Sequence, residues 1–220
     1  MVYGNSSKKL YLNNRLLTNE VKITTATAVK DFAFYGYYSL SKVILSDSVT
    51  SLGDSVFSNC NLLTNLTIGK NLKIIGKEAF YNSEIENIYL QDVNQWVQID
   101  GLDCLMKYGS TDKNIYVNNV LLTEANFSSA TTISSYAFYG YKKLTEVTFG
   151  EQVVLIGAYA FLNCSSLSNA YFENPNGWFT TLDPTEDNTN ILTLNDSSKN
   201  ANNLRYSNYG TSYLKRNQNA

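Results

Sequence analysis

The apolar residues of this chain recur every 23 residues. Phe34, Phe57 and Phe80 stand 23 positions apart, and Phe138 and Phe161 repeat that spacing. Each of the five follows a small or β-branched residue and has an aliphatic residue five positions before it. We expect both positions to face inward, the first being Ala33, Val56, Ala79, Ala137 and Ala160, the second Val29, Leu52, Ile75, Ile133 and Ile156. A fixed period of this length predicts one structural unit repeated along the chain.

Two bends are predicted in each unit. Two residues after the Phe stands a Gly or Asn, the residue types that adopt a left-handed backbone at least steric cost: Gly36, Asn59, Asn82, Gly140 and Asn163. Four residues before the Phe, three units carry Gly53, Gly76 and Gly157, while Lys30 and Ser134 stand there in the first and fourth units. We therefore expect a short extended piece, a bend, and a tight turn around each Ala-Phe pair.

An L-x-x-L-x-L pattern follows each turn and predicts a half-buried strand. Its apolar triplets are Leu40/Val43/Leu45, Leu63/Leu66/Ile68, Ile85/Ile88/Leu90, Leu144/Val147/Phe149 and Leu167/Ala170/Phe172. One unit cannot bury its apolar side alone, but stacked units bury it continuously. The pattern thus predicts a mostly β repeat solenoid with one short parallel strand per 23-residue repeat.

The recurring phrase also carries a family resemblance. "LIGAYAFLNC" and "IIGKEAFYNS", each followed by the strand pattern, resemble the BspA-like (Treponema-type) leucine-rich repeat over residues 10 to 172. The resemblance implies a right-handed leucine-rich repeat superhelix with short turns and helical turns. The third copy departs from the pattern by one missing residue between Phe80 and Ile85.

A longer period divides the array into two blocks. Residues 2–20 match residues 107–125 at an offset of 105, and the phrases around Trp96 and Trp178 match at an offset of 82. We predict one solenoid over 1–172, with blocks 1–105 and 106–172 and a lateral insertion at 91–114. The Asn-Asn pairs at 13–14 and 118–119 favour hairpins that bulge from each block. Trp96 is expected to pack, because Trp recurs at the matching place.

The two ends of the chain carry predictions of their own. Because the chain opens on a phrase that belongs inside a block, we expect Met1 to begin a piece of a longer protein. Residues 173–220 turn polar and are predicted to form a cap, since an exposed last repeat would leave an open apolar edge.

Composition excludes several partners. The 220 residues are 44% hydrophobic with a net charge of -2, and no basic stripe suits nucleic acid or an anionic membrane. No apolar run is long enough to span a membrane, and the first residues lack a signal peptide's apolar core. The abundance of Asn, Ser, Thr and Tyr suits an extracytoplasmic protein, so we expect an extracellular or cell-surface location with a native export signal missing here.

The sequence favours no catalytic or cofactor site. There is no His for a Ser-His or Cys-His nucleophile and no glycine-rich phosphate loop, so we predict no enzymatic activity, no cofactor and no metal. Asp100/Asp103 and Asp183/Glu186/Asp187 are the main acidic groups. A Ca²⁺ loop at the latter is conceivable, but its spacing is not that of an EF-hand and favours a solvated loop. Cys60, Cys104 and Cys164 are odd in number and predict no disulfide framework, and Cys60 and Cys164 occupy an expected half-buried position three residues after a Phe.

The outward positions of the predicted strands are the candidate binding surface. They form one expected ladder of Lys42, Ile44, Asn65, Thr67, Asn87, Tyr89, Glu146, Thr148, Asn169 and Tyr171. Solenoid curvature often makes such a ladder concave, and its Tyr, Asn and Thr content suits hydrogen bonding to protein or glycan. The same residues are also good strand formers that simply face water. The family resemblance implies adhesion to an extracellular protein or glycan of a host or neighbouring cell; the alternative is a structural spacer that displays another domain.

Overall fold

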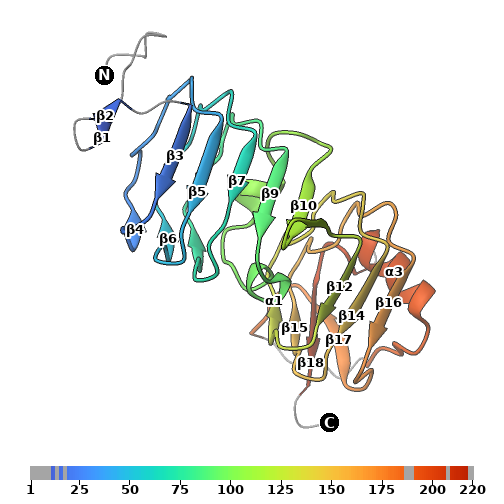
Figure 1. Cartoon of the computed structure of the whole chain (residues 1–220). Helices are drawn as coiled ribbons and strands as arrows, with labels where there is room; N and C mark the ends of the chain where they lie inside the picture. Colours follow the sequence, from blue (N-terminus) through green and yellow to red (C-terminus); the bar gives the residue numbers. More distant parts are fainter. Residues whose placement is uncertain (1–10, 13–14, 17–18, 186–190, 207–208, 218–220) are drawn as a thin grey trace.

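The fold is a stack of coils with a parallel sheet along its front (Figure 1). The computed structural model describes residues 11–12, 15–16, 19–185, 191–206 and 209–217 of the chain. In the first block the front sheet has the order β11-β10-β9-β7-β5-β3. Its strands are β3 (Glu20–Ile23), β5 (Lys42–Leu45), β7 (Asn65–Thr67), β9 (Asn87–Leu90), β10 (Asn114–Val117) and β11 (Val120–Leu121). The repeat solenoid predicted from the 23-residue period is confirmed.

A separate front sheet belongs to the second block. It contains β12 (Glu124–Phe127), β14 (Glu146–Phe149) and β16 (Asn169–Phe172), paired in parallel in the order β12-β14-β16. The two front sheets are not hydrogen-bonded to each other, because β11 turns back antiparallel to β10 and takes the place of the next parallel strand.

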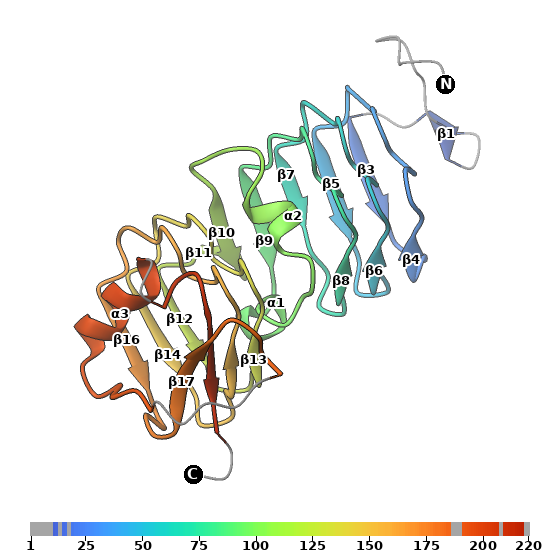
Figure 2. The same cartoon turned by 180° about the vertical axis from the view of Figure 1, so that it is seen from behind.

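The short extended pieces form sheets of their own along the back (Figure 2). In the first block these are β4 (Ala28–Val29), β6 (Ser51–Leu52) and β8 (Ile74–Ile75), all parallel. In the second block β13 (Thr132–Ile133) pairs in parallel with β15 (Leu155–Ile156). Each regular coil therefore has a second, two-residue strand besides the predicted one.

The phenylalanines of the repeat stack into the core. Phe57 is fully buried between Phe34 and Phe80, with ring centroids 5.2 and 5.5 Å apart, and Phe138 stacks on Phe161 at 5.4 Å. The small residues before them are buried except Ala33, for which the inward prediction is wrong. Ala33 lies in the first described coil, so no regular preceding coil covers it.

The predicted tight turn after each Phe is present, and a second left-handed position accompanies it. The Gly and Asn residues after the Phe have φ between 53° and 69°, as predicted. Two residues before each Phe, five further non-Gly residues also have positive φ: Phe32, Ser55, Glu78, Tyr136 and Tyr159. At these positions the Ser55 N–H donates to the Lys77 carbonyl of the next coil at 2.8 Å. Likewise, the Tyr136 N–H donates to the Ala158 carbonyl at 3.2 Å.

The glycines of the other bend are required by close coil packing. A Cβ at Gly76 would lie 2.5 Å from the backbone carbon of Gly53 in the preceding coil, and one at Gly157 would lie 2.3 Å from the Ser135 nitrogen. Lys30 and Ser134 stand at this position in the first repeat of each block, where the regular preceding coil is absent. Their departure from the pattern follows from this place in the stack.

Residues 91–114 complete a modified coil. They contain α1 (Val93–Trp96) and α2 (Asp103–Met106), and the side chains of Trp96, Val97, Ile99, Leu102 and Cys104–Met106 are buried in the core. Asp100 bridges in parallel to Ile74 and so extends the back sheet by one residue. Trp96 packs as predicted, since it is only 1% exposed.

Two hairpins share one register. Asn118 and Asn119 have φ of 50° and 66° and form the turn between β10 and β11, as the Asn-Asn pair predicted. β1 (Tyr11–Leu12) and β2 (Arg15–Leu16) pair antiparallel with Tyr11 opposite Leu16, the same register as Tyr116 opposite Leu121. The predicted turn at 13–14 lies outside the described residues.

The end of the chain folds back over the last coil. The helix α3 (Ser197–Arg205) lies beside β16, and the Asn200 side chain donates to the Ala170 carbonyl at 3.1 Å. On the back, β18 (Tyr213–Arg216) pairs antiparallel with both β15 and β17 (Trp178–Thr181). Both the front and back sheets thus have their last strand covered by this segment.

Candidate functional site

The structure brings six of the ten predicted surface residues together on the first front sheet. Lys42, Asn65 and Asn87 are in register, and so are Ile44, Thr67 and Tyr89. Every one of these side chains is half-buried, while the residues between them are fully buried. This alternation places the six on the outer face of the solenoid.

A ladder of asparagine amides runs across this face. The Asn87 side chain donates to the Asn65 amide oxygen at 3.4 Å, and the Asn114 side chain donates to that of Asn87 at 2.9 Å. Beside the ladder, the rings of Tyr89 and Tyr116 stack at 4.9 Å with an interplanar angle of 11°. The register of β9 and β10 explains both contacts, because Asn87 lies opposite Asn114 and Tyr89 opposite Tyr116. We call Asn65, Asn87, Asn114, Tyr89 and Tyr116 the Asn-Tyr surface.

Ion pairs occupy the other end of the same sheet. The Glu20 carboxylate lies 3.1 Å from the Lys42 ammonium and 3.2 Å from that of Lys22. Hydrogen bonds from Lys42 and Lys22 lower the pKa of Glu20. The face therefore changes from charged at β3 and β5 to neutral and aromatic at β9 and β10.

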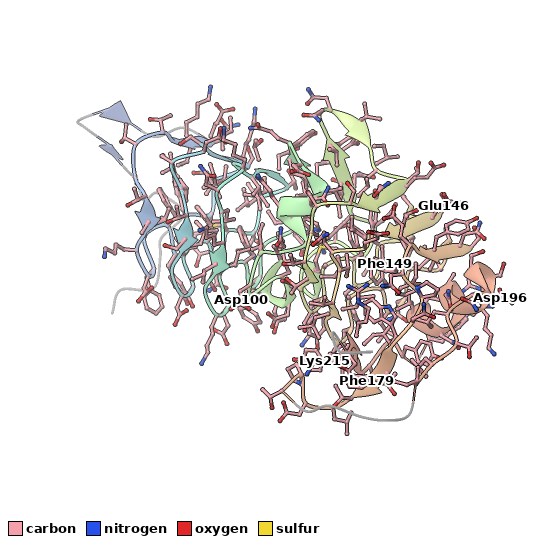
Figure 3. The ribbon with its side chains drawn as sticks, turned by 90° about the horizontal axis from the view of Figure 1, so that it is seen from below. Asp100, Glu146, Phe149, Phe179, Asp196 and Lys215 are labelled. Atoms are coloured by element: carbon pink, nitrogen blue, oxygen red, sulfur yellow. The ribbon has the colours of Figure 1, made fainter. Side chains whose placement is uncertain are left out.

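The remaining four predicted residues lie on the other front sheet. Glu146 is in register with Asn169, and Thr148 with Tyr171, which is 43% exposed. Asn169 also accepts a hydrogen bond from the Ser197 hydroxyl at the start of α3. The prediction of one continuous ladder is therefore wrong, because the β10–β11 hairpin separates two shorter ones. In Figure 3, Glu146 and Lys215 of β18 lie on opposite sides of Phe149, so front and back are separated by the core.

Six residues of these faces were missed by the repeat pattern, namely Glu20, Lys22, Asn114, Tyr116, Glu124 and Asn126. The L-x-x-L-x-L pattern begins after an Ala-Phe turn, and no such turn precedes their strands. A signal for two of them was present, since "NIYV" at 114–117 repeats "NIYL" at 87–90.

The cysteines are buried thiols. Cys60 and Cys164 are both 0% exposed, so the expectation of a half-buried position is wrong. Their thiols donate to the carbonyls of Phe34 at 3.3 Å and Phe138 at 3.0 Å in the preceding coil. Burial raises the pKa of the Cys60 thiol to about 12, and burial raises the pKa of Cys164 as well. All three cysteines are free thiols.

The acidic groups are only partly described. Asp183 accepts hydrogen bonds from the Thr185 hydroxyl and backbone N–H, and these lower its pKa. Glu186 and Asp187 lie outside the described residues. Asp103 begins α2, and Asp100 makes the bridge to Ile74. Within the described ranges, no three Asp, Glu, Cys or His residues gather in a way that could hold a metal ion.

Comparison with known families decides the classification. The sequence model for the BspA type leucine rich repeat region matches six copies over residues 11–100 and 110–185. The chain belongs to the BspA-type leucine-rich repeat family. The five units from which the 23-residue period was found all lie within these ranges. No curated protein matches the chain.

A comparison with solved structures finds alignments to bacterial leucine-rich repeat proteins and to a vaccine antigen. A leucine-rich repeat protein of T. pallidum aligns at 20% identity and a TM-score of 0.39, covering 70% of this chain and 80% of that one. A leucine rich cell surface protein of Faecalibacterium prausnitzii aligns at 20% identity and a TM-score of 0.43, covering 81% of this chain and 54% of that one. The pneumococcal vaccine antigen PcpA aligns at 17% identity and a TM-score of 0.36, covering 70% of this chain and 50% of that one. This chain therefore spans only about half of the latter two proteins.

None of the described helices has the length and hydrophobicity needed to cross a lipid bilayer.

Proposed function

We propose that this chain is a non-enzymatic binding module of an extracellular or cell-surface bacterial protein. Its partner is a protein or glycan of a host or neighbouring cell, and the contact is made by the outer faces of the front sheets. Membership of the BspA-type family supports this role, as does a sequence without a single His. The cell-surface origin of one structurally similar protein is consistent with the location.

The observation that carries the proposal is the Asn-Tyr surface. Asparagine amides present both donors and acceptors, and tyrosine rings present rigid contact area at low entropic cost. In the ladder each amide uses only part of its capacity, since Asn114 donates to Asn87 and Asn87 donates to Asn65. The strands beneath hold these groups in fixed positions, so a ligand would find them already arranged.

A structural spacer remains the second candidate. Its supporting observation is the same amide ladder, because the side-chain hydrogen bonds between coils stabilise the stack whether or not a ligand binds. Under this alternative the Asn-Tyr surface holds coils together, and the array displays another domain.

A binding screen separates the two candidates. The purified chain would be tested against extracellular matrix proteins and a glycan array, beside the Tyr89→Ala/Tyr116→Ala double variant. The matched control is Tyr35→Ala/Tyr81→Ala, since these tyrosines are 43% and 41% exposed on the Ala-Phe turns, outside the strand face. We expect a ligand that the first variant loses and the control keeps. A folded chain that binds nothing in either screen would favour the spacer.

A further inference from the structure

A polar cavity lies where the chain passes from the front strands to the back strands of the second block. Its volume is about 340 Å³. Its polar lining residues are Thr131, Gln152, Asn174, Asn176, Arg216 and Asn217, and Val154 is the apolar one. No carboxylate is among them. The volume falls at the small end of the range for ligand pockets, roughly 300–1,000 Å³, and therefore suits one small polar unit.

Arg216 belongs to this lining and has no acidic partner among the described residues. Its Nη2 donates to the Glu151 carbonyl at 2.7 Å, and its centre lies 5.9 Å from the Trp178 ring. Nη1 is buried and has no hydrogen-bond partner, and no ion pair of the described residues includes Arg216. The neighbouring Glu173 carboxylate instead accepts the Glu151 backbone N–H at 3.2 Å. A partly buried cation left in this way favours an anion close by.

A comparison within the chain indicates that the Asn176 amide is available. In the first block the corresponding residue is Asn94, because Asn94 stands two residues before Trp96 as Asn176 stands two residues before Trp178. Its side chain accepts from the Ser129 and Ala130 N–H groups, each at 3.1 Å, and donates to the Asn126 carbonyl. Asn94 thus binds the coil that follows it.

Among the described residues, no repeat coil follows the one that precedes Asn176. The backbone N–H of Asn176 donates to the Asn174 side chain at 3.2 Å, as that of Asn94 does to Asp92 at 2.8 Å, so both loops begin alike. Asn176 is exposed and belongs to the lining of the cavity. The loop is held in shape by the Trp178 indole N–H, which donates to the Asn174 carbonyl at 2.9 Å.

We propose that this cavity binds a carboxylated sugar unit. Amides and a threonine hydroxyl offer the mixed donors and acceptors that sugar hydroxyls require, and the Arg216 charge complements a carboxylate. The cavity residues are not part of the Asn-Tyr surface, so this site goes beyond the proposed function and can fail without it.

Calorimetric titration with D-glucuronic acid, and with D-glucose for comparison, tests the site on the purified chain. We expect saturable binding of glucuronic acid that is about tenfold weaker in Asn176→Ala and in Arg216→Gln, and about tenfold weaker for glucose. Lys199→Gln on α3 is the charge control and should bind as the parent does. Circular dichroism checks folding. If Arg216→Gln does not fold, the exposed Asn176→Ala variant carries the test.

Three results would overturn the proposal: no saturable binding, equal binding of the two sugars, or unchanged binding by Asn176→Ala. The Tyr89→Ala/Tyr116→Ala variant should bind glucuronic acid as the parent does. Loss of glucuronic acid binding in that folded variant would also contradict a separate site.

Discussion

The indole N–H of Trp96 donates a 3.0 Å hydrogen bond to the carbonyl of Ala137, and both residues are buried. This bond joins the modified coil at 91–114 to the Ala-Phe turn that opens the second block. Asn94, two residues earlier, binds the backbone at Ser129 and Ala130. Two residues of one short helix, α1, thus supply hydrogen bonds to the junction between the blocks.

The Trp96 bond can be removed with little change of shape. Trp96→Phe keeps an aromatic ring in the core but leaves the Ala137 carbonyl without this donor. We expect the free energy of unfolding to fall by about 1–3 kcal/mol, measured by urea denaturation. Tyr116→Phe, which alters an outward side chain, should change it by less than about 0.5 kcal/mol. Equal effects of the two substitutions would show that the bond does not hold the junction.

The phenylalanine stack should dominate stability. Phe57→Ala empties a fully buried site between two rings, and we expect a loss of roughly 3–5 kcal/mol in the free energy of unfolding. Phe32→Ala is the matched control, because Phe32 is 59% exposed and should cost less than about 0.5 kcal/mol. Chemical denaturation followed by circular dichroism measures both. A loss below about 1 kcal/mol at Phe57 would contradict close core packing.

The left-handed residues before the Phe predict a stabilising glycine. Glu78 is exposed with φ of 53°, a conformation that costs an L-residue about 1–2 kcal/mol, whereas the entropic cost of glycine is about 0.5–1 kcal/mol. Glu78→Gly should therefore raise the free energy of unfolding by about 0.5 kcal/mol. Glu86→Gly, exposed and without positive φ, should lower it by about 0.5–1 kcal/mol. Thermal melts of the two variants decide the matter, and the same sign of change in both would refute the strain argument.

Buried Lys113 predicts a pH-dependent stability. Its ammonium donates to the carbonyls of Tyr108 at 2.6 Å and Ser110 at 2.7 Å, and desolvation lowers the pKa of Lys113 to about 8. Between that value and its ordinary pKa of 10.5, the unfolded chain holds a proton that the folded chain has released. The unfolded state then binds more protons, so stability rises with pH in this window.

Lys113→Met lacks the titrating group and isolates this effect. Urea unfolding of the parent and the variant would be measured at pH values from about 7 to 9. We expect the stability of the parent to increase relative to the variant as the pH rises, while the thiols, whose pKa values are raised in both proteins, cancel. Parallel pH profiles would contradict the assignment.

The same phrase can form different structures in the two blocks. Trp96 and Trp178 are matched in sequence and both are buried, yet Trp96 lies in α1 and Trp178 in β17. Gly177, with φ of 75°, precedes Trp178, whereas Gln95 precedes Trp96 within a helix. The sequence match predicted the burial of both indoles, and the local backbone decided their secondary structure.

The sequence by itself determined the coil, its turns and its inward residues. These features depend on contacts between equivalent positions one repeat apart, such as Phe34 with Phe57, so the period of the chain records them directly. The alternation of apolar and polar residues in each strand likewise identified the outward Asn65, Asn87 and Tyr89, because neighbouring strand residues face opposite ways.

Only the tertiary structure decided where the repeats are interrupted and joined. β10 continues the first front sheet, β11 ends it, and the Asn ladder consequently extends to Asn114. The bond from Trp96 to Ala137 and the antiparallel pairing of β18 with β15 likewise join residues that are not one repeat apart. Such contacts leave no period in the sequence, because each is made once, between segments that only folding brings together.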